Sequence, residues 1–190
     1  MKHILITTIA AVLVVGCGES QSPELSTAKA PVISIHWAAK TGNIEAVKQH
    51  LAAGADVNTK HKPYGTPLHS AANKEIAELL IANGADVNAK DIYDRTPLHA
   101  VAEEGHKAVA DLLIAKGADV NAKDVDGWTP LHIATREVAE SLTVNGADVN
   151  AKGFGGTPLD RAIKYNHTET ADLLRKHGGK TGAELKAEGK

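Results

Sequence analysis

The chain has 190 residues, with 21 basic and 23 acidic side chains and a formal net charge of −2. The basic residues are dispersed, so no basic patch points to nucleic acid as a ligand. Aromatic residues make up only 3% of the chain and there is one cysteine, so we expect a single domain with an aliphatic core and no disulfide.

The first residues have the pattern of a secretory signal. Lys2 precedes an apolar run from Ile4 to Val15, which is too short for a membrane-spanning helix of about 20 residues. The sequence Val-Val-Gly-Cys that ends at Cys17 resembles the lipobox of bacterial lipoproteins. That resemblance implies a signal peptide over residues 1–16, cleaved before a lipidated Cys17. A plain secretory signal, or a cytosolic chain with a misread start, are the alternatives.

The lipoprotein resemblance also implies a location in the bacterial cell envelope. Gly18 stands where an aspartate would retain a lipoprotein at the inner membrane of Gram-negative cells, so we expect an outer-membrane anchor facing the periplasm. Residues 17–31 are rich in Ser, Pro and Ala without periodicity, and we interpret them as the lipidated cysteine and a flexible tether.

One stretch of the chain, Thr96 to Trp128, is a complete copy of a unit that recurs on both sides of it. Thr96-Pro97 has the form of an N-cap followed by a proline at the first helical position. Apolar residues at helical spacing follow, then a break at Gly105, a second helical pattern, and a stop at Gly117. The unit is therefore predicted to be helix, turn, helix and extended loop.

The same unit recurs along the chain. Thr-Pro-Leu begins at Thr66, Thr96, Thr129 and Thr157, at spacings of 30, 33 and 28 residues, and the sequence GADVN occurs four times. This resembles the ankyrin repeat, whose period is about 33 residues with a T-P-L-H-x-A signature. The resemblance implies an all-α solenoid of about five stacked helix-turn-helix units with extended loops, over residues 32–180. The expected repeats lie near 34–65, 66–95, 96–128, 129–156 and 157–180, and a tail over 181–190 forms a trailing helix or frays.

Two of these repeats are shorter than the third, which has 33 residues. The second and fourth lack the Gly-His turn found at Gly105, and the missing three or four residues equal about one helical turn. We therefore predict that the first helix of each is one turn shorter, which leaves a notch beside the third repeat.

Histidines recur at one position per repeat: His36, His69, His99 and His132, with Asp160 at the fifth. The ankyrin resemblance implies that each bonds its signature threonine and a neighbouring loop, so no metal site is expected. The sequence has no nucleophile elbow and no phosphate-binding glycine loop, so we expect no cofactor and no enzyme activity.

The resemblance implies that a protein partner binds the concave side, formed by the loops and the first helices. The loop before each Thr-Pro carries one aromatic residue: Tyr64, Tyr93, Trp128 and Phe154. Aromatic residues are enriched at binding hot spots, but rings at these positions could instead stiffen the stack. We add to the candidate partner-binding residues Arg95, Glu103, Glu104, Ile133 and Arg161, for which a solvated helix face is the alternative.

Two aromatic positions need separate comment. Trp37 either packs under the tether or the second repeat, or lies exposed as a partner contact. Tyr64 and Asp94 occupy the position of Gly127 in their loops, and a left-handed backbone there tolerates Asp but strains Tyr, so the first loop should turn differently.

These observations favour a monomeric, non-catalytic protein-interaction module, attached to the membrane through lipid on Cys17. The alternative is an inhibitor or immunity-type protein that occludes a partner enzyme. Both would use the same fold, and they differ only in the partner.

Overall fold

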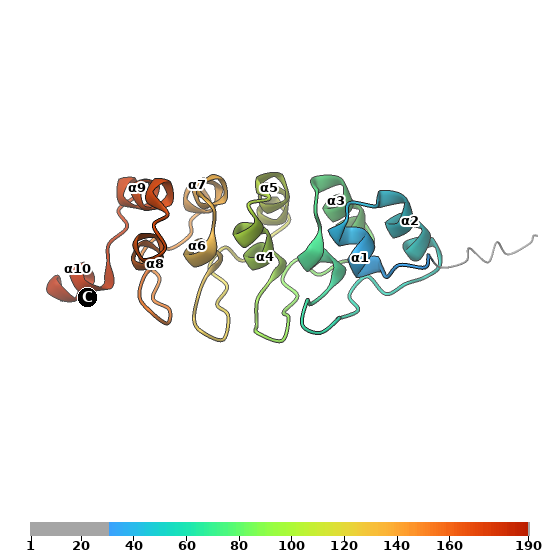
Figure 1. The fold of residues 1–190 in the computed structure, drawn as a ribbon, viewed down its shortest axis with the longest axis horizontal. Coiled ribbons are helices and arrows are strands. Elements are labelled where there is room, and N and C mark those ends of the chain that lie inside the picture. The colour runs from blue at the N-terminus through green and yellow to red at the C-terminus, as the bar shows by residue number, and fades with distance from the viewer. Residues whose placement is uncertain (1–30, 190) are drawn as a thin grey trace, which may run out of the picture.

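The computed structural model describes residues 31–189, in which helical pairs stack side by side in one row (Figure 1). The pairs are α1 (Ile35–Lys40) with α2 (Ile44–Ala52), the 3-10 helix η1 (Pro67–Ser70) with α3 (Lys74–Ala82), α4 (Pro97–Glu104) with α5 (Lys107–Ala115), α6 (Pro130–Ile133) with α7 (Arg136–Val144), and α8 (Pro158–Lys164) with α9 (Thr168–Lys176). A short α10 (Gly182–Ala187) follows. The described part of the chain contains no strand, only isolated bridges, so the predicted all-α solenoid of stacked units is confirmed.

The helix boundaries follow from the repeated signature. Thr96 has an extended backbone and Pro97 takes the first helical position, where its missing amide costs no hydrogen bond. Gly105, at φ 78°, ends α4 in the left-handed region that favours glycine. Gly117, at φ 89°, follows the cap of α5 in the same conformation. The caps and stops predicted from the sequence are therefore confirmed in this unit.

The core is a continuous line of aliphatic side chains through the row. Each unit buries the leucine of its signature, or Ile35 in the first unit, and an aliphatic residue of its second helix; Leu98 and Leu113, for example, are both 0% exposed. Alanines such as Ala102 and Ala110, also fully buried, let neighbouring helices approach closely. No unit encloses its own core, because each apolar face is covered by the next unit.

The asparagine of each GADVN sequence joins its unit to the next one. The side-chain amide of Asn88 donates to the carbonyl of Gly117 (3.1 Å) and its oxygen accepts from the backbone N–H of Asp119 (2.9 Å). The same pair of bonds is made by Asn58, Asn121 and Asn150 to the following unit. This ladder explains why GADVN recurs: it belongs to the stack and not to one site.

The signature histidines also connect neighbouring units. The backbone N–H of Thr96 donates to Nδ1 of His99 (3.1 Å), so Nε2 carries the ring proton and donates to the carbonyl of Trp128 (3.1 Å). His69 and His132 repeat this arrangement. Burial lowers the pKa of each of these three histidines, and that of His132 falls to about 4. The structural role expected of these residues is therefore confirmed.

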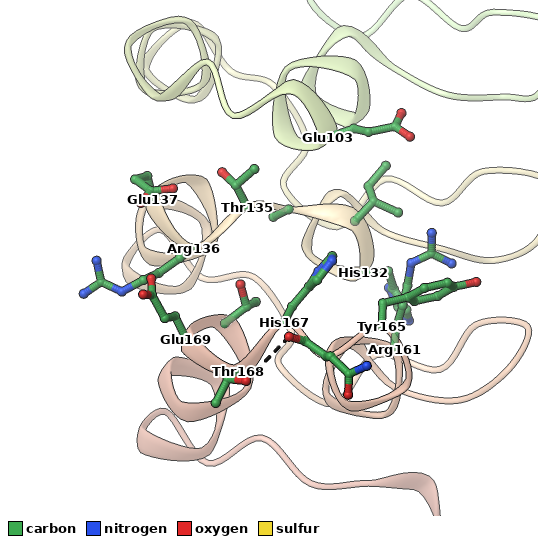
Figure 2. Close-up of a pocket in the computed structure, with 14 residues that line it drawn as sticks. Glu103, His132, Thr135, Arg136, Glu137, Arg161, Tyr165, His167, Thr168 and Glu169 are labelled. Atoms are coloured by element: carbon green, nitrogen blue, oxygen red, sulfur yellow. Dashed lines mark hydrogen bonds between the residues drawn. The ribbon is translucent and has the colours of Figure 1, made fainter.

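The predicted shortening of two first helices is also confirmed. η1 and α6 have four residues each, whereas α4 has eight. In place of the missing turn the backbone is extended and forms a hydrogen bond to the preceding unit. Ala72 N–H donates to the carbonyl of Ala39 (3.2 Å), and Thr135 N–H donates to that of Ala102 (3.0 Å). In the fourth unit the missing turn leaves a cavity of about 660 Å³, lined by Thr135 and by residues of α4, α8 and α9 (Figure 2).

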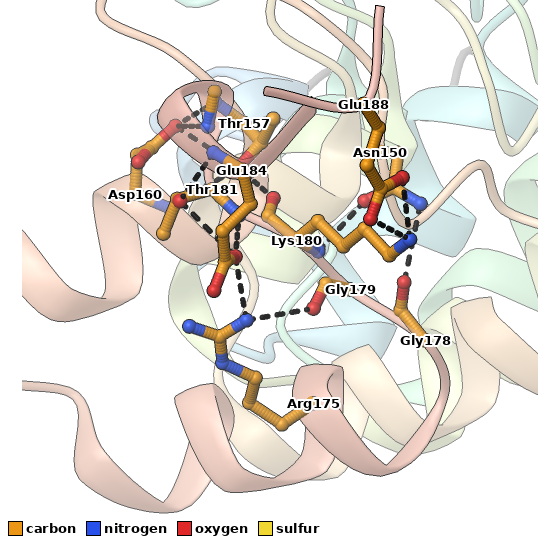
Figure 3. A network of polar contacts seen from close by, with 11 residues as sticks. Asn150, Thr157, Asp160, Arg175, Gly178, Gly179, Lys180, Thr181, Glu184 and Glu188 are labelled. Carbon is orange, nitrogen blue, oxygen red and sulfur yellow. Dashed lines mark hydrogen bonds and ion pairs between the residues drawn. The ribbon is translucent and has the colours of Figure 1, made fainter. Parts of the chain in front are cut away.

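α10 closes the last unit with a copy of the signature geometry (Figure 3). Thr181 N–H donates to Glu184 Oε2 (2.7 Å), as Thr157 N–H donates to Asp160 Oδ2 (2.8 Å). Asp160 Oδ2 also accepts from the N–H of Gly182 (2.8 Å), which ties α8 to α10. Arg175 pairs with Glu184 at 2.7 Å and holds the pKa of that carboxyl at about 2. The polar side chains at this end of the row therefore form hydrogen bonds and an ion pair that join α10 to α8 and α9.

Candidate functional site

The most organised part of the surface formed by the loops and the first helices surrounds Arg161 on α8. The guanidinium carbon of Arg161 lies 3.8 Å from the ring centroid of Trp128 and 5.0 Å from that of Tyr165. Trp128 is itself fixed, because its indole N–H donates to the carbonyl of Phe154 (2.6 Å) in the next loop. We call this surface the loop face, and the group of Trp128, Arg161 and Tyr165 the arginine clamp.

Helix geometry and loop geometry together build the clamp. Arg161 and Tyr165 are separated by four residues, so they lie on one face of α8 and its C-cap. Trp128 ends the preceding loop, where its backbone N–H donates to Asp124 Oδ1 (2.8 Å). The ring thus arrives from a different unit and meets the guanidinium across the gap between units. Arginine stacks well on aromatic faces because its planar group is weakly hydrated.

Three cavities meet at Arg161. The notch of about 660 Å³ is the largest, and Arg161 and Tyr165 both line it (Figure 2). A cavity of about 280 Å³ lies beside it between Trp128, Phe154 and Lys164. A third, of about 170 Å³, lies toward the third unit. Arg161 lines all three, so the three cavities adjoin one another around the clamp.

Six of the partner-binding residues predicted from the sequence line the third cavity: Tyr93, Arg95, Glu103, Trp128, Ile133 and Arg161. Arg95 pairs with Glu103, which fixes both side chains at its wall. Tyr93 is half exposed, at 50%. Phe154, at 80% exposure, lines the second cavity. The structure therefore brings seven of the nine candidate binding residues together.

The other two candidates lie elsewhere. Glu104 is at the end of α4, where it pairs with His106 at 3.0 Å, and it lines none of the three cavities. Tyr64 belongs to the first loop and lines a separate cavity of about 140 Å³ with Trp37. Trp37 is 55% exposed, which corresponds to the exposed alternative for that residue.

The loop turns explain why Tyr64 is displaced from the pattern. Gly127 has φ 74° and Asp94 has φ 60°, so both are left-handed at the equivalent position. In the first loop the left-handed residue is Gly65, at φ 73°, and the backbone of His61 pairs with that of Gly65. The predicted difference of the first loop is therefore confirmed.

Sequence reasoning missed Tyr165, Lys164 and Asp126, which line the cavity beside Phe154. A signal for Tyr165 was present, because it follows Arg161 by one helical turn and is half exposed. Asp126 had no such signal. Aspartates are common in the turns of these loops, and the sequence does not show which of them lines a cavity.

Between residues 31 and 189, no cluster of three or more His, Cys, Asp or Glu side chains is arranged to hold a metal ion. Over the same range, none of the helices has the length and apolar character that crossing a membrane requires.

Stacked helical pairs joined by extended loops define a helical repeat protein. A family model described as ankyrin repeats (3 copies) matches residues 35–124 and 120–186. The chain therefore belongs to the ankyrin-repeat family. A search of curated proteins found no match. Ankyrin repeats are typically protein–protein interaction modules and are generally not catalytic, which agrees with a binding surface on the loop face.

Proposed function

We propose that this protein is a monomeric interaction module that binds another protein on its loop face. The observation that carries the proposal is the group of adjoining cavities around Arg161, which gathers Tyr93, Trp128, Phe154 and Tyr165 from four successive units. Aromatic and arginine side chains in pockets are the usual anchors of protein interfaces. Partly exposed rings that already have one fixed contact lose little conformational entropy when a partner covers them.

The second part of the proposal is a lipid anchor on Cys17 that holds the domain in the bacterial envelope, at the outer membrane and facing the periplasm. Its support is the sequence, since residues 1–16 and Cys17 lie outside the described residues. An anchored domain is confined to the membrane surface, where even a moderate affinity for a membrane-associated partner gives high occupancy.

The anchor is tested by labelling cells with an alkyne-bearing fatty acid and detecting the label on the purified protein. We expect label on the natural chain, recovery in the membrane fraction, and neither for Cys17→Ser. Equal labelling of the Cys17→Ser variant, or a natural chain that is released without label, would remove the anchor from the proposal.

The binding face is tested by quantitative affinity capture from the native membranes. We expect the double variant Tyr93→Ala/Trp128→Ala to lose the captured partner while Glu140→Ala, on the exposed side of α7, retains it. Thermal unfolding of both variants controls for the fold. Undiminished capture by the double variant would mean that these rings are not part of the interface.

A further inference from the structure

The arginine clamp has a specific chemical property: its cation stacks on two rings but has no carboxylate partner in the part of the chain that the structure describes. The seven ion pairs found among residues 31–189 include Arg95 with Glu103 and Arg175 with Glu184, but none contains Arg161 or Lys164. Apart from these ring contacts, the guanidinium of Arg161 donates no hydrogen bond to another described residue. Its N–H groups are therefore free for a ligand.

The position of this cation sets it apart from the unpaired lysines elsewhere on the surface. Arg161 is partly buried, lies against two rings, and stands where the three cavities meet. Stacking fixes the plane of the guanidinium but leaves the N–H groups at its edge available, which suits bidentate binding of a carboxylate. The ammonium of Lys164 lies 5.5 Å from the ring centroid of Tyr165 and adds a second positive charge at the same cavity.

The surrounding charges decide which anion fits. Asp126 lines the same cavity as Arg161 and Lys164, and Glu103, Asp124 and Asp126 line the next one. These carboxylates repel a phosphate, which carries close to two negative charges, more strongly than they repel a carboxylate, which carries one. The walls formed by Trp128, Phe154 and Ile133 favour an apolar side chain next to that carboxylate.

We propose that the arginine clamp binds an aspartate or glutamate side chain of the partner protein, flanked by an apolar residue that occupies the adjoining cavity. This inference rests on the proposed loop-face function and names the chemistry of the anchor residue. Arg161 is the receptor for the carboxylate, Trp128 and Tyr165 orient the guanidinium, and Lys164 strengthens the local positive potential.

The test uses a peptide library, so that it does not depend on knowing the partner. The mature chain, residues 17–190, is produced without its signal peptide and immobilised through Cys17, the only cysteine in the sequence. Random peptides of about twelve residues displayed on phage are selected against it, and the enriched peptides are synthesised. Each acidic residue of a selected peptide is then replaced by the matching amide, Asp by Asn or Glu by Gln.

We expect one acidic position whose replacement weakens binding by about tenfold or more, which corresponds to loss of a charge-assisted bond. Arg161→Gln should cause a loss of the same size. The two changes together should cost little more than either alone, because each removes the same contact. Arg161→Lys should recover only part of the affinity, since lysine cannot make the bidentate contact. Arg136→Gln is the matched control, because Arg136 lines the notch but stacks on no ring among residues 31–189.

The outcomes separate this inference from the proposed function. If the selected peptides lose affinity on Tyr93→Ala but bind the Arg161→Gln variant normally, the carboxylate assignment is overturned and the loop face stands. If no peptide is enriched, or enriched peptides ignore both substitutions, the carboxylate assignment and the loop face are both contradicted. Thermal unfolding of Arg161→Gln checks that a loss of binding is not a loss of fold.

Discussion

Acidification should destabilise this protein well above the pH at which carboxylates are protonated. In the folded chain Nδ1 of His132 accepts a hydrogen bond from the N–H of Thr129 (3.0 Å). A proton added to Nδ1 would break this bond and would point at another N–H donor. Burial, with the nearby charge of Arg161, lowers the pKa of His132 from 6.5 to about 4. Because the folded pKa lies below the unfolded one, this stability is complete above pH 6.5 and is lost as the pH falls toward 4.

The size of the effect follows from linkage. Lowering the pH from 7.5 to 5 with a pKa of 6.5 unfolded and about 4 folded reduces the free energy of unfolding by about 2 kcal/mol for His132 alone. Burial lowers the pKa of His36, His69 and His99 as well, so they act in the same direction. The pKa of Glu184, at about 2, affects stability only at lower pH, outside this window.

Urea unfolding followed by circular dichroism at pH 7.5 and at pH 5 measures the difference. The matched variant is His132→Asn, whose side-chain oxygen can accept from Thr129 N–H much as Asp160 accepts from Thr157 (2.8 Å) but does not titrate. We expect it to be less stable than the natural chain at pH 7.5 and to lose about 2 kcal/mol less between the two pH values. Equal unfolding midpoints at both pH values for the natural chain, or an unchanged pH dependence in the variant, would refute this reasoning.

Three further predictions follow from the stack itself. Leu113→Ala should cost about 2–5 kcal/mol in urea unfolding, because the side chain is fully buried between units and its removal leaves a cavity. Asn88→Ala should cost about 0.5–1.5 kcal/mol, because it removes two bonds between units that are exposed, so that water can replace the lost partner of the Asp119 N–H. Amide exchange should be faster in η1 and α6 than in α4, because a four-residue helix forms few internal hydrogen bonds; equal protection would contradict this.

Most of the fold could be predicted because residues within each repeat determine where its helices begin and end. Thr96-Pro97 defines a helix start and Gly105 its end by local backbone preferences that need no tertiary information. The shortening of α6 could be derived by counting, because a loss of about one turn keeps the next helix in phase. That count also predicted the notch, whose volume is about 660 Å³.

The candidate site was predicted only in outline. The loop aromatics could be found because one occurs in the loop before each Thr-Pro, and Arg161 because it takes a variable helix position. The contact between Arg161 and Trp128 could not be found, because it joins side chains of two units across a gap whose width depends on packing. Glu104 could not be separated from Glu103 by spacing alone, since the pairing of Glu104 with His106 depends on how the turn after α4 closes.

The measurement that tests the central claim most directly is photo-cross-linking in living cells of the native host. A benzophenone amino acid is placed at Tyr93, at Trp128, and at Glu140, an exposed residue of α7 that lines none of the three cavities. Binding on the loop face predicts one cross-linked protein from positions 93 and 128 and none from position 140. Cross-links that form equally from position 140, or only from there, would contradict the assignment of the loop face as the binding surface.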